Sequence, residues 1–157
     1  MSTNPTIPAD APPADARDWV ALTAAALSAA DVVAFVTDPA AGGIDVFLGT
    51  TRSETSTAGQ ALLALDYEAY GEMATKQLHD LARRAREQWP VARLALLHRT
   101  GRVLVGAPSV IIAVATPHRA DAFAACRWLI DTLKADVVIW KREVWADGIG
   151  TWVHPGA

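Results

Sequence analysis

Two of the three lysines in the chain lie near each other, and their spacing suggests a site for an anion. Lys134 falls at the end of a predicted helix, and Lys141 falls in the strand expected to follow it. The net charge of the chain is −3, so an anionic ligand has to be met by a local basic cluster of this kind. From spacing alone a second interpretation stays open, in which Lys134 is solvated and complements the dipole at its helix end.

The predicted strand around Lys141 sorts its polar side chains onto two faces. Successive side chains of a strand point to opposite sides. Lys141 and Glu143 therefore share one face, while Trp140 and Arg142 share the other. We expect the first pair to lie on the same side as the end of the preceding helix.

Two further basic sites, one a pair of residues and the other a single arginine, fit an anion. His118 and Arg119 open the same predicted helix, where free backbone N–H groups and the helix dipole favour negative charge. Exposed first-turn residues are an equally good interpretation of that pair. Arg52 follows Thr50 and Thr51 in a polar loop, and a guanidinium beside hydroxyls suits a phosphate or carboxylate. Loop arginines are common, so this position alone is a weak signal.

Other kinds of chemistry find little support in the sequence. Cys126 lies on the apolar side of a predicted helix, which favours a buried, unreactive thiol. With a single cysteine, a reducing cytoplasm is the expected compartment. The spacing of histidines and carboxylates predicts no metal site. His98 and Arg99 end a predicted strand, and we interpret them as structural. The acidic net charge gives no argument for nucleic-acid binding, and no apolar run is long enough to span a membrane.

The elements that must position these residues follow from hydrophobic periodicity and from Gly and Pro. Apolar residues at helical spacing predict two long helices. One covers Tyr70–Trp89, with Met73, Leu78, Leu81 and Ala85 inward, and the other follows Thr116–Pro117, with Phe123, Cys126, Leu129, Ile130 and Leu133 inward. Ser28 is expected to cap a shorter helix that ends near Thr37. Strands are predicted at 19–23, 44–49, 61–68, 94–97, 102–105, 110–115, 137–145 and 151–153.

This order mixes helices and strands without strict alternation. It predicts an α+β fold: a mixed, largely antiparallel sheet with helices packed on one face, similar to an α/β hammerhead, plus a small β subdomain. A length of 157 residues predicts one domain over 17–157. The stretch 1–16 is rich in Pro and Ala, and we expect it to form a flexible N-terminal arm.

Six short segments in matching order resemble the molybdopterin synthase large subunit, the MoaE family, over roughly Trp19 to Trp152. Each segment is short, but six in sequence with matching gaps are specific. They are FLGTTR (47–52), LDYEAYGEMATKQL (65–78), HRTGRVLVG (98–106), HRADAF (118–123), IDTLK (130–134) and IWKRE (139–143).

The resemblance implies a sulfurtransferase of molybdenum cofactor biosynthesis. Members of this family convert cyclic pyranopterin monophosphate to molybdopterin by inserting two sulfurs as a dithiolene. The sulfur arrives as a thiocarboxylate on the C-terminal Gly-Gly of a small ubiquitin-like partner, whose tail enters a pocket of the large subunit. The resemblance also implies a cytoplasmic heterotetramer, with a central homodimer of large subunits and a small subunit at each end. We expect no cofactor, no metal, no nucleic acid and no membrane contact.

The resemblance assigns site roles to matching positions. Lys134 matches an essential lysine beside the partner's terminal glycine, and Lys141 matches a second pocket lysine, so both are expected to be catalytic. Our hypothesis is that Lys134 assists sulfur attack and release of the partner carboxylate, while Lys141 stabilises the anionic intermediate. The full expected substrate-binding set is Thr50, Thr51, Arg52, His118, Arg119, Lys134, Lys141, Arg142 and Glu143.

Helix geometry adds an expectation about assembly. His118 and Lys134 stand at opposite ends of one predicted helix, on the order of 24 Å apart at about 1.5 Å per residue. A small pterin cannot easily touch both. We therefore expect a composite site, with Lys134 and Lys141 from one protomer and His118 and Arg119 from the other.

One departure from the family pattern leaves a rival function open. The family often has Lys-Val where this chain has Thr50 and Thr51, which removes a positive charge from the loop. The alternative is a non-catalytic relative that binds a ubiquitin-like Gly-Gly tail without turnover. A stand-alone anion-binding enzyme of another class would need a nucleophile or metal set that the sequence does not offer.

Overall fold

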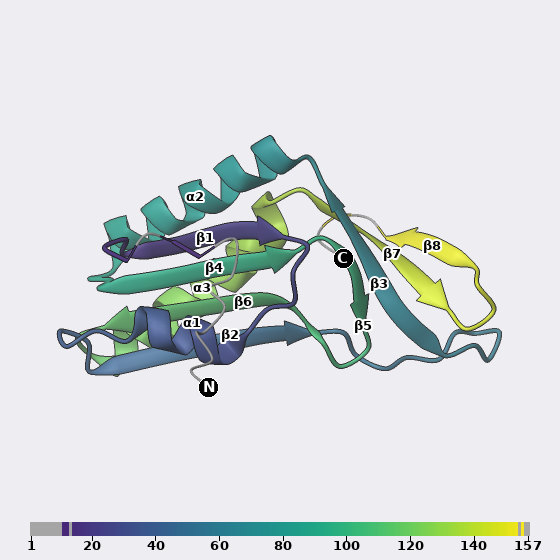
Figure 1. The fold of residues 1–157 in the computed structure, drawn as a ribbon, viewed down its shortest axis with the longest axis horizontal. Helices are drawn as coiled ribbons and strands as arrows, with labels where there is room; N and C mark the ends of the chain where they lie inside the picture. Colours follow the sequence, from purple (N-terminus) through teal and green to yellow (C-terminus); the bar gives the residue numbers. More distant parts are fainter. Residues whose placement is uncertain (1–10, 13, 154, 156–157) are drawn as a thin grey trace, which may run out of the picture.

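The computed structural model describes residues 11–12, 14–153 and 155, and over this range it contains two sheets and three helices (Figure 1). Most of the predicted N-terminal arm, 1–10 and 13, lies outside the described residues. In chain order the elements are β1 (Asp18–Thr23), α1 (Ala29–Val36), β2 (Gly43–Thr50), β3 (Leu62–Ala69), α2 (Gly71–Gln88), β4 (Arg93–Arg99), β5 (Gly101–Leu104), β6 (Pro108–Thr116), α3 (Arg119–Asp136), β7 (Ile139–Trp145) and β8 (Gly150–Val153).

The first sheet has the strand order β1-β4-β6-β2 and carries most of the core. The β1–β4 pair is parallel, and the other two pairs are antiparallel. Helices α2 and α3 cover one face, where Leu96 and Ile112 are fully buried. Helix α1 covers the opposite face, where Ile111 and Ala113 are fully buried. The expectation that all helices lie on one face was therefore wrong for α1, because β4 and β6 are apolar on both faces and both need a cover.

Two side chains assigned to the buried helix faces are exposed. Phe123 of α3 has 59% of its surface accessible, and Met73 of α2 has 43%. Each stands about one residue step, or about 100°, to the side of its helix's buried stripe. The neighbouring small residues Ala122 and Ala74 take the contact with the core instead. Ser28 caps α1 as expected, with its hydroxyl accepting a hydrogen bond from the Asp31 N–H at 3.2 Å.

The second sheet is the predicted small β subdomain, and its strand order is β5-β3-β7-β8. All of its pairs are antiparallel. It lies beside the end of the first sheet where β4 and β2 finish (Figure 1). The chain passes from β4 into β5 at Gly101, whose φ of +78° few other residues adopt readily. The α+β class is thus confirmed, and the meeting of the two sheets positions the residues discussed below.

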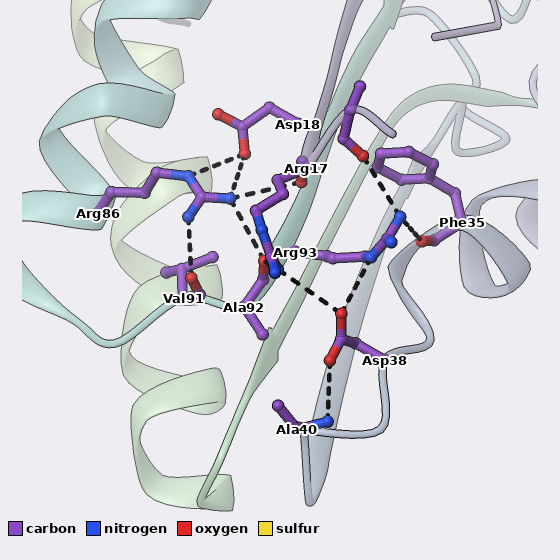
Figure 2. Close-up of polar contacts among 10 residues, drawn as sticks. Arg17, Asp18, Phe35, Asp38, Ala40, Arg86, Val91, Ala92 and Arg93 are labelled. Atoms are coloured by element: carbon purple, nitrogen blue, oxygen red, sulfur yellow. Dashed lines mark hydrogen bonds and ion pairs between the residues drawn. The ribbon is translucent and has the colours of Figure 1, made fainter. Parts of the chain in front are cut away.

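Ion pairs and carbonyl contacts fasten the edge strand β1 to the rest of the first layer. Figure 2 shows Arg86 of α2 directed at Asp18, with Nε and Nη2 donating to Asp18 Oδ1 at 2.9 and 2.6 Å. Its Nη1 donates to the Val91 carbonyl at 2.9 Å. Nearby, Arg93 donates to Asp38 at 3.2 Å and lies over the Phe35 ring.

Among the described residues, no helix is long and apolar enough to cross a membrane.

The Arg86 contacts should contribute measurably to stability. Replacing Arg86 with Met keeps the apolar stem but removes the charged donors, so we expect unfolding to become easier by about 1–3 kcal/mol. Chemical denaturation monitored by circular dichroism gives this value. Arg83→Met is the matched control, because in the described part of the chain Arg83 pairs with exposed carboxylates of its own helix, Asp80 and Glu87. Equal effects of the two substitutions would show that the Arg86 contacts add nothing.

Candidate active site

A cavity of about 490 Å³ opens where the two sheets meet. Its walls come from the ends of β2 and β4, the start of β6, the last turn of α3 and the inner face of the second sheet. This volume lies within the range of about 300–1,000 Å³ that is usual for small-molecule sites. The apolar part of the wall consists of Phe47, Leu48, Leu62, Leu65, Val110, Ile130, Leu133, Val137 and Ile139.

Both predicted catalytic lysines line this cavity. Lys134 belongs to the last turn of α3, and Lys141 is the third residue of β7. The pKa of Lys134 lies below its usual value, first because the cavity walls partly desolvate its ammonium, and second because the charge of Lys141 repels it. The two amines therefore sense each other across the cavity. Part of the Lys134 side chain stays exposed, which leaves the amine open to a ligand.

The loop after β2 supplies the rim of the cavity. Thr50, Thr51 and Arg52, the residues of the expected ligand loop, all line it. Arg52 is mostly exposed and pairs with Glu54 at 2.8 Å. Thr51 is 2% exposed, and its backbone is fixed by hydrogen bonds with Ala107 and Gly106. Its Oγ1 is one of two buried side-chain polar atoms in the described residues without a hydrogen-bond partner. This hydroxyl can therefore form a hydrogen bond with a ligand.

The IWKRE segment divides as strand alternation predicts. Lys141 and Glu143 line the cavity, whereas Arg142 is absent from the described residues that do so. Arg142 instead donates to Asp66 at 3.2 Å on the other face of the second sheet. Arg102 binds the same carboxylate with two donors at 2.8 and 2.9 Å. These two arginines, Arg102 first, hold the pKa of Asp66 below its usual range.

His118 and Arg119 lie outside the cavity of their own chain. His118 occupies the N-cap position of α3 without a capping hydrogen bond from its side chain, and both residues are exposed. The backbone of Arg119 lies directly against Gly43, so close that a Cβ at Gly43 would stand 2.9 Å from the Arg119 Cα. Gly43 begins β2 and Thr50 at the cavity ends it, a separation of about 23 Å at about 3.3 Å per residue. The length of β2 therefore leads to the same conclusion as the length of α3: His118 and Arg119 lie far from the cavity of their own chain.

Sequence reasoning missed four polar residues of the cavity wall, Glu54, Tyr67, His98 and Ser109, and His98 and Tyr67 contact each other. His98 is 6% exposed, and its ring meets that of Tyr67 edge to face at 5.0 Å between centroids. Burial lowers the pKa of His98 to about 4, and the charge of Lys134 adds to that shift. Burial also raises the pKa of Tyr67. His98 has the same strand parity as Leu94 and Leu96, but Ala95 and Leu97 of the opposite parity are buried as well, so alternation in β4 gave no signal that this ring lines a cavity.

The remaining candidates behave as structural residues. Cys126 is buried, and burial raises the pKa of its thiol to about 12, so a reactive thiolate does not form near neutral pH. Within the part of the chain that the structure describes, no three His, Cys, Asp or Glu side chains gather in a way that could hold a metal.

Comparisons with known proteins agree on one family. The family model described as MoaE protein matches residues 22–136. A molybdopterin synthase catalytic subunit from Nostoc is 44% identical over 142 residues, which cover 90% of this chain and 85% of the relative. The human protein of the same name is 40% identical, with 87% and 71% covered. The crystal structure of molybdopterin synthase from Staphylococcus aureus is similar at a TM-score of 0.78 and 33% identity, with 84% of this chain and 94% of that chain covered. This chain belongs to the MoaE family.

Proposed function

We propose that this chain is the catalytic subunit of a molybdopterin synthase. It would transfer sulfur from the C-terminal thiocarboxylate of a small ubiquitin-like partner to cyclic pyranopterin monophosphate, giving molybdopterin. One observation carries the proposal: two lysines, one with a lowered pKa, share a cavity with an unpaired buried hydroxyl. The names of the relatives, which are catalytic subunits, support the same activity and the existence of a second subunit.

The charges of the cavity suit the proposed ligands. A thiocarboxylate and a cyclic phosphate are both anions, and fixed positive charge brings them into contact at little reorganisation cost. Lys134 would assist sulfur attack and release of the partner carboxylate. Its lowered pKa favours this role, because partial desolvation and the charge of Lys141 make the ammonium release its proton more easily than a free lysine does. Lys141 would stabilise the anionic intermediate.

The remaining residues would bind and orient the substrate. The hydroxyls of Thr50 and Thr51 and the guanidinium of Arg52 would contact the pterin or its phosphate at the rim. Glu143, on the same face of β7 as Lys141, would orient that lysine or a ligand N–H group. Arg142 lies on the other face of the sheet, so it would influence the substrate site only indirectly, through its pairing with Asp66.

The same activity requires two copies of the chain. About 23 Å separates Arg119 from the cavity along β2, which is too far for one small pterin. His118 and Arg119 of a second protomer would therefore complete each cavity, in a homodimer with one small subunit at each end. The single cysteine fits a cytoplasmic assembly. We take 17–157 as the domain that carries this activity.

Lys134→Ala should abolish molybdopterin formation and leave partner binding nearly unchanged, because one amine is lost while the cavity walls remain. The assay mixes the protein with a thiocarboxylated partner ending in Gly-Gly and with cyclic pyranopterin monophosphate, and it detects the dithiolene product. Calorimetry measures partner affinity. Lys76→Ala, the third lysine and one on the exposed side of α2, is the control. Near-normal turnover of Lys134→Ala would end the catalytic assignment, and a wild-type protein that binds the partner without product would favour the non-catalytic alternative.

Hybrid dimers test the shared site. Lys134→Ala and His118→Ala should each be inactive alone, whereas their mixture should recover part of the activity, since one of the two hybrid cavities keeps both groups. Subunit exchange is verified by native mass spectrometry. Absence of recovery despite exchange would count against a composite site.

The lowered pKa of Lys134 has two causes, and one of them can be removed. In Lys141→Gln the repelling charge is gone while desolvation remains, so the pKa of Lys134 should rise but stay below its usual value. Competitive acylation across a pH series, read by peptide mass spectrometry, measures it. At a fixed pH below that pKa, Lys134 should react more slowly than in the wild type. An unchanged pKa would mean that the two amines do not sense each other, and Lys76→Gln controls for general charge effects.

A further inference from the structure

His98 stands in the cavity wall with a defined hydrogen-bonding pattern. Its Nδ1 lies 2.7 Å from the carbonyl oxygen of Arg99. A carbonyl only accepts hydrogen bonds, so Nδ1 carries the proton. With its pKa near 4 the ring is neutral at pH 7, and Nε2 is then an acceptor. The ring is fixed from two sides, by the Arg99 carbonyl and by the edge of Tyr67.

The neighbours of His98 distinguish it from an ordinary core histidine. It lines the same cavity as Lys134, and Lys134 is near enough for its charge to disfavour protonation of the ring. The ammonium of Lys134 is carried on a flexible four-carbon stem with three donors. The charge of Lys141 repels this ammonium. A neutral acceptor on the cavity wall is therefore a favourable hydrogen-bond partner for it.

We propose that His98 is a positioning residue for Lys134, offering Nε2 as an uncharged hydrogen-bond acceptor that directs the ammonium into the cavity. This inference rests on the proposed function of Lys134. A neutral acceptor suits this place better than a carboxylate, because it orients the amine without neutralising it and without repelling the two anionic substrates. A protonated His98 would lose the acceptor and add a third positive charge beside the lysines.

The other charged and titratable groups around the cavity come from each of the elements that form its walls. They are Lys134 from α3, Lys141 and Glu143 from β7, Tyr67 from β3, and Arg52 and Glu54 from the loop after β2. Arg99 follows His98 in the chain. A variant that changes His98 alone leaves these groups in place, so a change in the pKa of Lys134 can be assigned to His98.

Two substitutions separate positioning from packing. His98→Phe keeps a ring in the wall and continues to exclude water, but it removes Nε2. His98→Gln lacks the ring but returns an amide oxygen near the position of Nε2. We expect kcat to fall about ten- to hundredfold in His98→Phe, as for the loss of a hydrogen bond to a charged group, with little change in the affinity for the small partner. His98→Gln should recover most of the turnover.

The pKa of Lys134 gives a readout that does not depend on activity. An acceptor stabilises the ammonium, so its removal in His98→Phe should lower the pKa of Lys134 further, while His98→Gln should leave it close to the wild-type value. A wall merely loosened by the substitution would admit water and raise that pKa instead. Competitive acylation of Lys134 across pH distinguishes the two directions.

The outcomes separate this inference from the proposed function. An unchanged or raised pKa of Lys134 in folded His98→Phe, or equal turnover of the Phe and Gln variants, would overturn the role of His98 even if the wild type makes molybdopterin. A wild type that makes no product would contradict the proposed function, while the pKa comparison would still decide whether His98 holds Lys134. If circular dichroism shows that His98→Phe does not fold, His98→Asn replaces it, since Asn keeps a donor for the Arg99 carbonyl but does not reach the position of Nε2.

Discussion

Two like charges held at one cavity are the constraint around which the rest of this structure is arranged. Lys134 and Lys141 would separate in a flexible chain, because their repulsion is unfavourable and partial desolvation strengthens it. The fold prevents separation through a very short connection between α3 and β7. Val137 in this connection is buried, and the N–H of Val138 donates to the Gln77 side chain of α2 at 3.1 Å. The two amines are thus fixed by groups that do no chemistry themselves.

The two layers contribute different parts of that rigidity. Helix α3 is held against the first sheet by a stripe of fully or nearly fully buried residues, and Leu129 is its most central large side chain. Strand β7 is held by β3, with Lys141 opposite Tyr67 in the register. The cavity forms where the two layers meet, so its position depends on both cores. A substitution deep in either core, such as one at Leu129 of the first layer, is therefore able to move one amine relative to the other.

Much of this arrangement could be predicted from the sequence, and the failures have definite causes. Strong periodicity gave the two long helices to within one or two residues, and alternation correctly assigned Lys141 and Glu143 to the face opposite Arg142. Family resemblance placed Arg142 among the substrate contacts, and strand parity proved the better guide to where its side chain points. His98 and Tyr67 were missed because their proximity depends on how the second sheet packs beside the end of β4. That packing joins segments distant in the chain, and local patterns carry no information about it.

The placement of the arginines gives a physical reason for the proposed composite site, in which one chain would hold only part of the positive charge. Within the cavity, Arg52 is partnered by Glu54, Glu143 stands on the same face as Lys141, and His98 is neutral. Arg142 and Arg102 are drawn away by Asp66. The free subunit thus avoids collecting many unpaired cations in one partly desolvated space, which would be costly without an anion present. Positive charge supplied by Arg119 of a second copy would be added at the mouth of the cavity, where solvent screens it until the anionic substrates enter. On this view the distance between the two ends of α3 serves the stability of the empty site as well as the binding of the filled one.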